Sequence, residues 1–156
     1  MTISRRRSRT LRKTENVPLP EGSRFDLAAL DTDILVSLLK GTSDAIEKIA
    51  ILQENEDKIS TTMINAYELI KGAYISSKRE DNLVKVREMI SNLHILDFSM
   101  GAAEEAARIY RELYDRGKLV GEFDILIAGI AKFHDEALVT RDAHFKSIRG
   151  IRIIDW

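Results

Sequence analysis

The sequence LAALDTD, at residues 27–33, is the stretch that decides the fold. An apolar run of this length that leads directly into acidic residues is typical of a short buried strand ending at the edge of a sheet. Strands that alternate with helices predict an α/β fold of three layers, in which helices cover both faces of a mostly parallel sheet of four to five strands. The further strands are predicted at residues 58–62, 94–98, 137–140 and 151–154, and the helices at residues 34–39, 43–54, 63–77, 81–92, 100–116 and 123–134.

Acidic residues recur where these elements meet. Asp31 follows the first strand, and Glu68 lies on the helix after the second. Asp124 begins the most apolar helix, and Asp142 follows the fourth strand. Ligands of parallel α/β sheets bind at the carboxyl ends of the strands, so we expect these four carboxylates to converge on one pocket. Because like charges repel, the cluster predicts a bound cation, and its oxygen ligands suit Mg²⁺ or Mn²⁺. The hypothesis is a metal-dependent enzyme that acts on phosphate.

Each of these acidic residues also has a simpler structural explanation. Asp31 or Asp33 suits the N-cap of the next helix, and Asp33 suits metal contact equally well. Glu68 is explained as a solvated side chain, and Asp124 by the dipole of its helix. Asp142 is explained by a turn or a surface ion pair. The occurrence of all four carboxylates at one edge of the sheet is what favours a functional site.

Composition limits the classes of function. The chain of 156 residues predicts one domain, and its lack of cysteine excludes disulfides, thiolate metal sites and cysteine nucleophiles. That composition suits a reducing cytoplasm, where we expect the protein to be located. No apolar run reaches the roughly 18 residues of a membrane span, so no membrane association is expected. The three histidines, His94, His134 and His144, lack the spacing of a zinc site and are expected at or near the surface.

The first 24 residues differ from the rest of the chain. Residues 1–24 carry seven Arg or Lys side chains against two Glu, and they have almost no apolar content. We expect a basic disordered tail over residues 1–24 and one folded domain over residues 25–156. The tail is explained as a solvated extension, as translation from an upstream start codon, or as an arm that contacts the phosphates of a nucleic acid.

Residues 26–156 resemble the PIN domains, and in particular the VapC-type toxin ribonucleases, in the order and spacing of their motifs. Asn is frequent in that family where Asp33 and Asp142 stand here, a change that keeps an oxygen ligand and adds negative charge. The segments that carry the resemblance are LDTDILVSLLKG at residues 30–41, NAYELIKG at residues 65–72, FDILIAGIA at residues 123–131, and TRD at residues 140–142 followed by Phe145 and the closing residues 151–156.

The resemblance implies a PIN-like fold and a Mg²⁺- or Mn²⁺-dependent endoribonuclease that hydrolyses RNA with a metal-activated water. It implies that Asp31 and Asp124 are the primary metal ligands and that Glu68 and Asp142 complete the pocket, with Asp33 as an additional candidate. It also implies homodimers and an antitoxin partner that threads a segment over the pocket, for which the helices at residues 43–54 and 63–77 would form a groove. Basic residues near the motifs are expected to contact RNA phosphates, namely Lys40, Lys71, Arg141 and Lys146. The four tyrosines, at helical spacings, are expected to be packing residues: Tyr67, Tyr74, Tyr110 and Tyr114.

Three alternatives remain open on the sequence. The first is a haloacid-dehalogenase-type phosphatase, because Asp31-Thr32-Asp33 matches the Asp-x-Asp start in which the first Asp is phosphorylated. That family's later Gly-Asp segment is not found here, and Glu68 would have no role in it. The second is a module that binds RNA or protein without cleavage. The third is an RNA-processing PIN nuclease that has no antitoxin.

Overall fold

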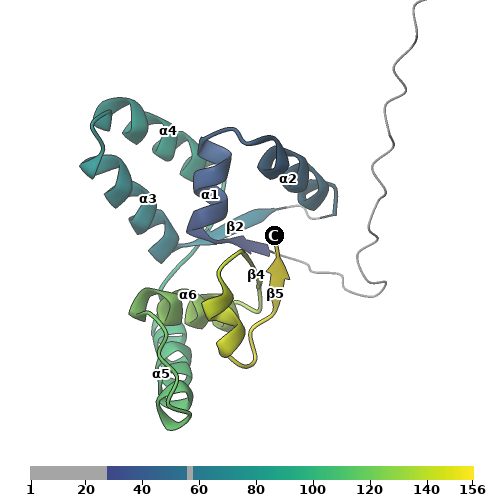
Figure 1. Cartoon of the computed structure of the whole chain (residues 1–156), viewed down its shortest axis with the longest axis vertical. Helices are drawn as coiled ribbons and strands as arrows, with labels where there is room; N and C mark the ends of the chain where they lie inside the picture. Colours follow the sequence, from purple (N-terminus) through teal and green to yellow (C-terminus); the bar gives the residue numbers. More distant parts are fainter. Residues whose placement is uncertain (1–27, 56–57) are drawn as a thin grey trace, which may run out of the picture.

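The computed structural model describes residues 28–55 and 58–156, so the predicted basic tail and the first residues of the predicted domain lie outside the described residues. Strands and helices alternate along the described chain (Figure 1). The strands are β1 (Ala28–Leu30), β2 (Ile59–Thr62), β3 (His94–Leu96), β4 (Ala137–Thr140) and β5 (Ile153–Asp155). The helices are α1 (Thr32–Leu39), α2 (Ser43–Asn55), α3 (Met63–Ile75), α4 (Arg79–Ser91), α5 (Met100–Asp115), α6 (Glu122–Phe133) and the short 3₁₀ helix η1 (Ala143–Ser147).

The five strands form one sheet in the order β3-β2-β1-β4-β5. Every neighbouring pair is parallel, which confirms the predicted mostly parallel sheet. From the central strand β1 the chain builds outward to β2 and β3 on one side, and later to β4 and β5 on the other. The strand order therefore reverses at β1, and ligands of such sheets bind outside the strand ends at this kind of reversal.

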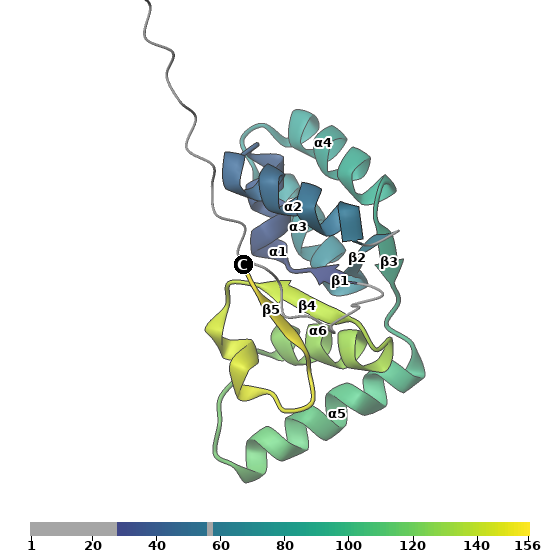
Figure 2. The same ribbon diagram turned by 90° about the vertical axis from the view of Figure 1, so that its right-hand side faces the viewer.

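Helices cover both faces of the sheet, as the apolar runs predict. Figure 2 shows α1–α4 on one side of the strands and α5, α6 and η1 on the other. Successive side chains of a strand point to opposite faces. Ala28 and Leu30 accordingly belong to the core under α1, α3 and α4, and Ala29 belongs to the core formed with α5 and α6. The three predicted layers are thus confirmed.

Helix ends follow local sequence signals, with one difference that matters for the site. Ser99 caps α5 by accepting the Ala102 N–H, and Gly41 ends α1 at a φ of +67°, which favours glycine. Of the two residues expected to suit the N-cap of α1, Asp31 is the cap, and Asp33 lies in the first helical turn. The turn begins immediately at the end of β1, so the capping carboxylate is also the one at the strand end.

Close packing of α5 against α6 fixes the position of the most apolar helix. A Cβ atom added to Gly129 of α6 would lie 2.7 Å from the Cβ of Ala106 on α5, so only glycine allows this approach. Apart from Gly129 itself, the buried residues of α6 are aliphatic or alanine. None of the helices among the described residues combines the length and apolar character needed to span a membrane.

Candidate active site

The predicted acidic residues come from four elements that meet at the carboxyl ends of β1 and β4. Asp31 directly follows β1, and Asp142 lies two residues beyond β4 as the N-cap of η1. Helix α3 carries Glu68 in its second turn, and α6 carries Asp124 in its first turn. This is the sheet edge at which the strand order reverses, so the local folding of the chain brings distant carboxylates to the place where the topology favours a ligand.

Asp31 is buried, with only 7% of its surface exposed, and both of its carboxylate oxygens accept hydrogen bonds. Oδ1 accepts the Thr32 N–H at 2.8 Å and the Asn65 Nδ2–H at 2.9 Å. Oδ2 accepts the Thr140 hydroxyl at 2.7 Å. The pKa of Asp31 is raised to about 6, chiefly by burial and also by the charge of Asp33, against the lowering effect of these donors. The carboxylate is therefore held in one orientation in a site that disfavours its charge.

Asn65 links Asp31 to Glu68. Its buried amide donates one hydrogen to Asp31 Oδ1 and the other to Thr32 Oγ1, each at 2.9 Å. Its carbonyl oxygen accepts the Thr62 hydroxyl at 2.6 Å, so every polar atom of the amide is used. The Thr32 hydroxyl in turn donates to Glu68 Oε2 at 2.6 Å. The network fixes the relative positions of two acidic side chains that come from different elements.

Asp124 and Asp142 form a second group together with His144. One ligand atom from each of these three residues lies within 4.8 Å of the other two, a spacing that suits a metal ion. The His144 Nδ1 atom is 3.3 Å from Asp142 Oδ1 and 3.9 Å from Asp124 Oδ2. Burial raises the pKa of Asp124, and the charges of Asp142 and Glu68 raise it further, while His144 opposes the shift.

The two groups adjoin through Thr140. Its hydroxyl donates to Asp31 and accepts the Asp142 N–H at 3.0 Å. Asp31 and Glu68 are not within the 4.8 Å grouping of Asp124, Asp142 and His144. Within the described ranges, no Lys or Arg side chain forms an ion pair with Asp31, Glu68 or Asp124. A carboxylate cluster without such counter-ions favours a cation as its partner.

Asp33 lies next to this cluster and contacts the segment after β4. Its Oδ2 atom accepts the Arg141 backbone N–H at 3.3 Å. The Arg141 guanidinium donates to Ser37 and to Asp44, each at 3.3 Å, and lies 5.8 Å from the centre of the Trp156 ring. These contacts tie Arg141 to α1 and α2. A metal contact at Asp33 and an RNA contact at Arg141 stay predictions.

The other three cations with predicted RNA contacts are in different surroundings. Lys146 forms an exposed ion pair with Asp155, with its Nζ atom 3.0 Å from Oδ1. Lys40 lies at the edge of a groove between helices. Lys71 lies beside two aromatic rings, close in sequence to Glu68. These RNA contacts also stay predictions.

Four residues that hold or complete the cluster were not singled out by the sequence. Asn65, Thr32 and Thr140 orient carboxylates, and His144 adds a nitrogen beside them. Asn65 carries a signal that was available, since it stands three positions before Glu68 on the same helix face. His144 was expected only as a surface residue. It is exposed, but η1 turns it back toward Asp142, and the sequence did not predict that helix.

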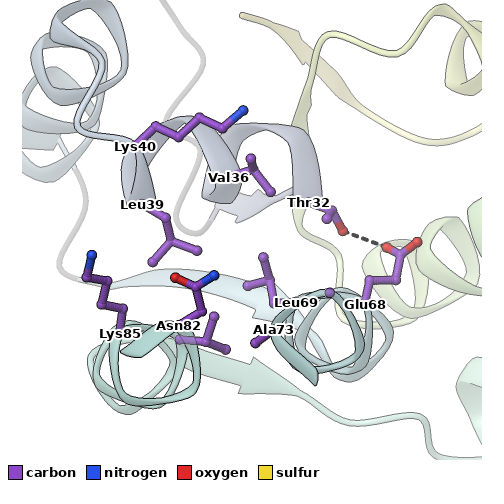
Figure 3. A pocket seen from close by; sticks show the side chains of 11 residues that line it. Thr32, Val36, Leu39, Lys40, Glu68, Leu69, Ala73, Asn82 and Lys85 are labelled. Atoms are coloured by element: carbon purple, nitrogen blue, oxygen red, sulfur yellow. Dashed lines mark hydrogen bonds between the residues drawn. The ribbon is translucent and has the colours of Figure 1, made fainter. Parts of the chain in front are cut away.

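An apolar groove with a volume of about 410 Å³ opens beside the acidic cluster between α1, α3 and α4 (Figure 3). It ends at Thr32 and Glu68, and its basic side chains are Lys40, at the C-cap of α1, and Lys85 of α4. Helix α2, which was expected to form a partner groove together with α3, does not line this groove, and the place of a partner segment stays a prediction. The apolar lining consists of Val36, Leu39, Leu69, Ala73 and Val86.

Comparison with known proteins agrees with this geometry. The family model described as the PIN domain matches residues 28–151. A protein of Salmonella typhimurium named tRNA(fMet)-specific endonuclease VapC is 36% identical over 128 residues, which cover 81% of this chain and 96% of that protein. A protein of the same name from Shigella flexneri is 32% identical over the same length and shares of the two chains.

Solved structures also resemble this chain. A chain in the structure of VapBC2 from Rickettsia felis, bound to a DNA fragment from its promoter, has a TM-score of 0.78 and 30% identity, over 83% of this chain and 98% of its own length. A chain in the DNA-bound VapBC structure from Salmonella typhimurium has a TM-score of 0.76 and 33% identity, over 85% and 98%. The chain described here therefore belongs to the PIN domain family and, within it, to the VapC-type toxin ribonucleases.

Proposed function

We propose that the catalytic centre of this endoribonuclease consists of Asp31, Glu68, Asp124 and Asp142, and that it works with a bound divalent metal. The observation that carries the proposal is the meeting of these carboxylates at one sheet edge without a Lys or Arg partner for Asp31, Glu68 or Asp124 among the described residues. The raised pKa values of Asp31 and Asp124 support it, because a cation relieves the cost of such charges.

The residues fit a divalent metal by their chemistry. Asp124, Asp142 and His144 offer two carboxylate oxygens and an imidazole nitrogen within 4.8 Å of one another. Asp31 is linked to Asp142 through Thr140, and the charge of Glu68 acts on Asp124. When bound, a metal of this kind lowers the pKa of a water and screens the charge of a phosphodiester. The protein contributes orientation, because Asn65 and Thr140 hold Asp31 and the Thr32 hydroxyl holds Glu68.

We further propose Mg²⁺ as the working ion, with Mn²⁺ as an effective substitute. Carboxylate oxygens dominate the candidate ligands, and both ions prefer oxygen. The His144 nitrogen favours Mn²⁺ over Mg²⁺ in binding strength, because imidazole is a better ligand for transition metals. Cleavage supported by both ions, with tighter binding of Mn²⁺, is the expected result.

The proposed substrate class is structured RNA, with tRNA as the first member to test. Two relatives at 32% and 36% identity are named as tRNA(fMet)-specific endonucleases. A site on an open sheet edge suits single-stranded loops, whose phosphates and bases are accessible from outside a helix.

We propose an antitoxin as the protein partner, seated in the groove between α1, α3 and α4. Solved structures that match this chain are of VapBC assemblies. The groove is apolar along its length and ends at Thr32 and Glu68, so a partner segment lying in it would place its last side chain beside the acidic cluster. A basic side chain at that point would neutralise the cluster and compete with the metal. Lys40 and Lys85 would pair with acidic residues of the same segment.

The decisive experiment is cleavage of labelled initiator tRNA by the antitoxin-free protein. Mg²⁺, Mn²⁺ and EDTA are compared, and Asp124→Asn is the matched control. We expect product that requires metal and disappears in the variant, because an amide neither neutralises the metal nor holds it as tightly. Cleavage of other RNAs but not of tRNA would contradict the proposed substrate and would still support the proposed metal-dependent cleavage.

Other outcomes separate the alternatives. Metal binding without cleavage of any RNA would favour a binding module, and covalent phosphorylation of Asp31 would favour a phosphatase. Cleavage by a protein that co-purifies with no partner, even when its neighbouring genes are co-expressed, would favour an RNA-processing nuclease that has no antitoxin. A chain that binds no divalent metal would overturn the proposed catalytic centre itself.

A further inference from the structure

An exposed aromatic pair stands immediately beside the acidic cluster. The rings of Tyr67 on α3 and Phe123 on α6 meet edge to face, with their centres 5.7 Å apart and their planes at 90°. Tyr67 is 50% exposed and Phe123 is 38% exposed, although both are large and partly apolar. Tyr67 was expected to be a packing residue, but half of its surface is exposed, so its ring is accessible to a ligand beside the acidic cluster.

The pair is tied to the catalytic centre by sequence and by helix geometry. Tyr67 precedes Glu68 and Phe123 precedes Asp124, and neighbouring Cα atoms are only about 3.8 Å apart. The same two helices that deliver two of the carboxylates thus deliver the two rings. A nucleotide whose phosphate lies at Glu68 and Asp124 would bring its own base, or that of its neighbour, within reach of these rings.

A cation completes the arrangement. The Lys71 Nζ atom lies 5.3 Å from the centre of each ring. Lys71 is four positions after Tyr67 and three after Glu68, so it stands between the rings and the carboxylate on one helix face. No carboxylate within residues 28–55 and 58–156 forms an ion pair with Lys71. Its charge is therefore available to a phosphate.

Aromatic rings next to a cation that has no carboxylate partner match the chemistry of single-stranded RNA. Bases stack on exposed aromatic side chains whatever their sequence, and lysines contact the intervening phosphates. A purely apolar partner would leave the charge of Lys71 unused. A chain that alternates flat bases with phosphates uses the rings and the cation together.

We propose that Tyr67 and Phe123 form a stacking platform for an unpaired RNA base next to the scissile phosphate. Lys71 contacts a phosphate beside that base. The inference rests on the proposed function and adds to it the residues that position the substrate. It predicts a preference for cleavage in loops, where a base is free to leave its neighbours and stack on protein.

The test measures binding of a labelled RNA that the unsubstituted chain cleaves, with Asp124→Asn as the parent so that the RNA stays intact. Tyr67→Ala in that parent is expected to weaken binding between about 5-fold and about 150-fold, the range for one stacked base. Tyr67→Phe keeps the ring and should bind like the parent. Lys71→Met should reduce the slope of log affinity against log salt by about one. Tyr110→Ala removes an equally exposed ring from another aromatic pair, on α5, and should have no effect.

Abasic RNA distinguishes stacking from general damage. Each unpaired nucleotide near the cleavage point is replaced in turn by one without a base. At one position, removal of the base should weaken binding by the parent as much as Tyr67→Ala weakens binding of intact RNA. Removal of the same base should not weaken binding by Tyr67→Ala any further. If Tyr67→Ala binds more weakly than the parent by the same factor on intact RNA and on every abasic RNA, the proposal is overturned.

Two other results would also overturn it. If Tyr67→Ala converts a dimer to a monomer in sedimentation while each protomer binds RNA unchanged, the rings form a contact between copies of the chain. If Tyr67→Ala binds RNA like the parent, the rings do not contact RNA. Failure of the proposed function is distinguishable, because the unsubstituted chain would then cleave no RNA in the presence of metal.

Discussion

The Thr140 hydroxyl donates a 2.7 Å hydrogen bond to Asp31 Oδ2 across 109 positions of sequence. The Thr140 Oγ1 atom also accepts the N–H of Asp142 at 3.0 Å. One buried hydroxyl at the end of β4 therefore orients the carboxylate at the end of β1 and the backbone of the next acidic residue. It joins the two halves of the cluster without being a candidate ligand itself.

Thr140→Val is expected to lower kcat/KM for RNA cleavage by about 10- to 100-fold, the usual effect of losing a residue that orients a metal ligand. Thr61→Val is the matched control, because the buried Thr61 hydroxyl donates to the Leu30 carbonyl in the same sheet. Both variants should lose about 1 kcal/mol of stability from one hydrogen bond. Equal losses of activity in the two variants would show that Thr140 acts through stability alone.

The acidic residues should differ in importance when each is changed to its amide. Asp31→Asn and Asp124→Asn are expected to abolish cleavage with the fold intact, because each removes a charged oxygen from the proposed centre. Asp33→Asn should retain most activity, since its Oδ2 atom already contacts the Arg141 backbone and Asn is frequent there in the family. The order of the three variants in activity is measured by initial rates of RNA cleavage at saturating Mg²⁺. Circular dichroism checks that each variant is folded. Equal loss in all three variants would contradict it.

The metal-free protein should lose stability as the pH rises through the titration of Asp31. Its pKa is raised from 3.8 to about 6, so its contribution is fully present below about pH 4 and is lost as the pH rises through about 6. The shift corresponds to about 3 kcal/mol at most. In EDTA, Asp31→Asn should show a flatter curve of unfolding free energy against pH than the unsubstituted chain. The exposed Asp81→Asn should follow the unsubstituted curve, and parallel curves for Asp31→Asn would refute the prediction.

His144→Ala should weaken Mn²⁺ binding more than Mg²⁺ binding, because it removes the imidazole nitrogen from the group formed with Asp124 and Asp142. Isothermal titration of each ion measures the two changes in Kd. His134→Ala is the control, since that ring pairs with Asp97 and stands at the opposite end of α6 from Asp124. Unchanged affinity for both ions would place His144 outside the metal site.

Glu136 forms a second titratable site, at the opposite end of β4 from the acidic cluster. It is only 3% exposed, and its Oε2 atom contacts the Ser60 hydroxyl. That hydroxyl also lies 3.0 Å from the Ala28 carbonyl oxygen. A hydroxyl has one proton, so both bonds form together only when Glu136 is protonated and donates. Burial raises the pKa of Glu136, and the Ser60 hydroxyl and two nearby histidines oppose the shift.

Glu136→Gln should therefore stabilise the protein at alkaline pH. With its pKa raised, Glu136 contributes stability that is fully present below the ordinary value of 4.5 and is lost as the pH rises through the folded value. The glutamine variant keeps a donor for Ser60 and carries no charge to bury. Thermal melts from pH 5 to pH 8, with the exposed Glu54→Gln as control, test this. A lower Tm for Glu136→Gln at pH 8 would contradict it.

Much of the fold was predictable because short apolar strands and amphipathic helices leave clear periodic signals. The LAALDTD stretch located β1 and its sheet edge, and the glycine at position 41 marked the end of α1. The η1 helix was missed because one turn after a strand has no periodicity to detect. The last strand, predicted at residues 151–154, begins at Ile153, an error of the size usual at element ends.

The acidic residues could be found from the sequence because their positions relative to strand ends are local information. Their partners could not, because a hydrogen bond such as that of Thr140 to Asp31 depends on how β1 and β4 pair. The solvent exposure of side chains was also not predictable from the sequence. Tyr67 has the helical spacing of a packing residue, and only the arrangement of α3 beside α6 reveals that half of its surface faces solvent.

The central position of β1 also governs when the site comes into being during synthesis. A nascent chain that has emerged only as far as α6 already carries Asp31, Glu68 and Asp124, but it lacks the strand that pairs with the other side of β1 and the hydroxyl that orients Asp31. Completion waits for residues 137–142, which supply β4 and the acidic residue after it. The order of the strands thus ties completion of the site to β4, because the carboxylate that follows β1 has no Thr140 hydroxyl to orient it until that later strand has paired.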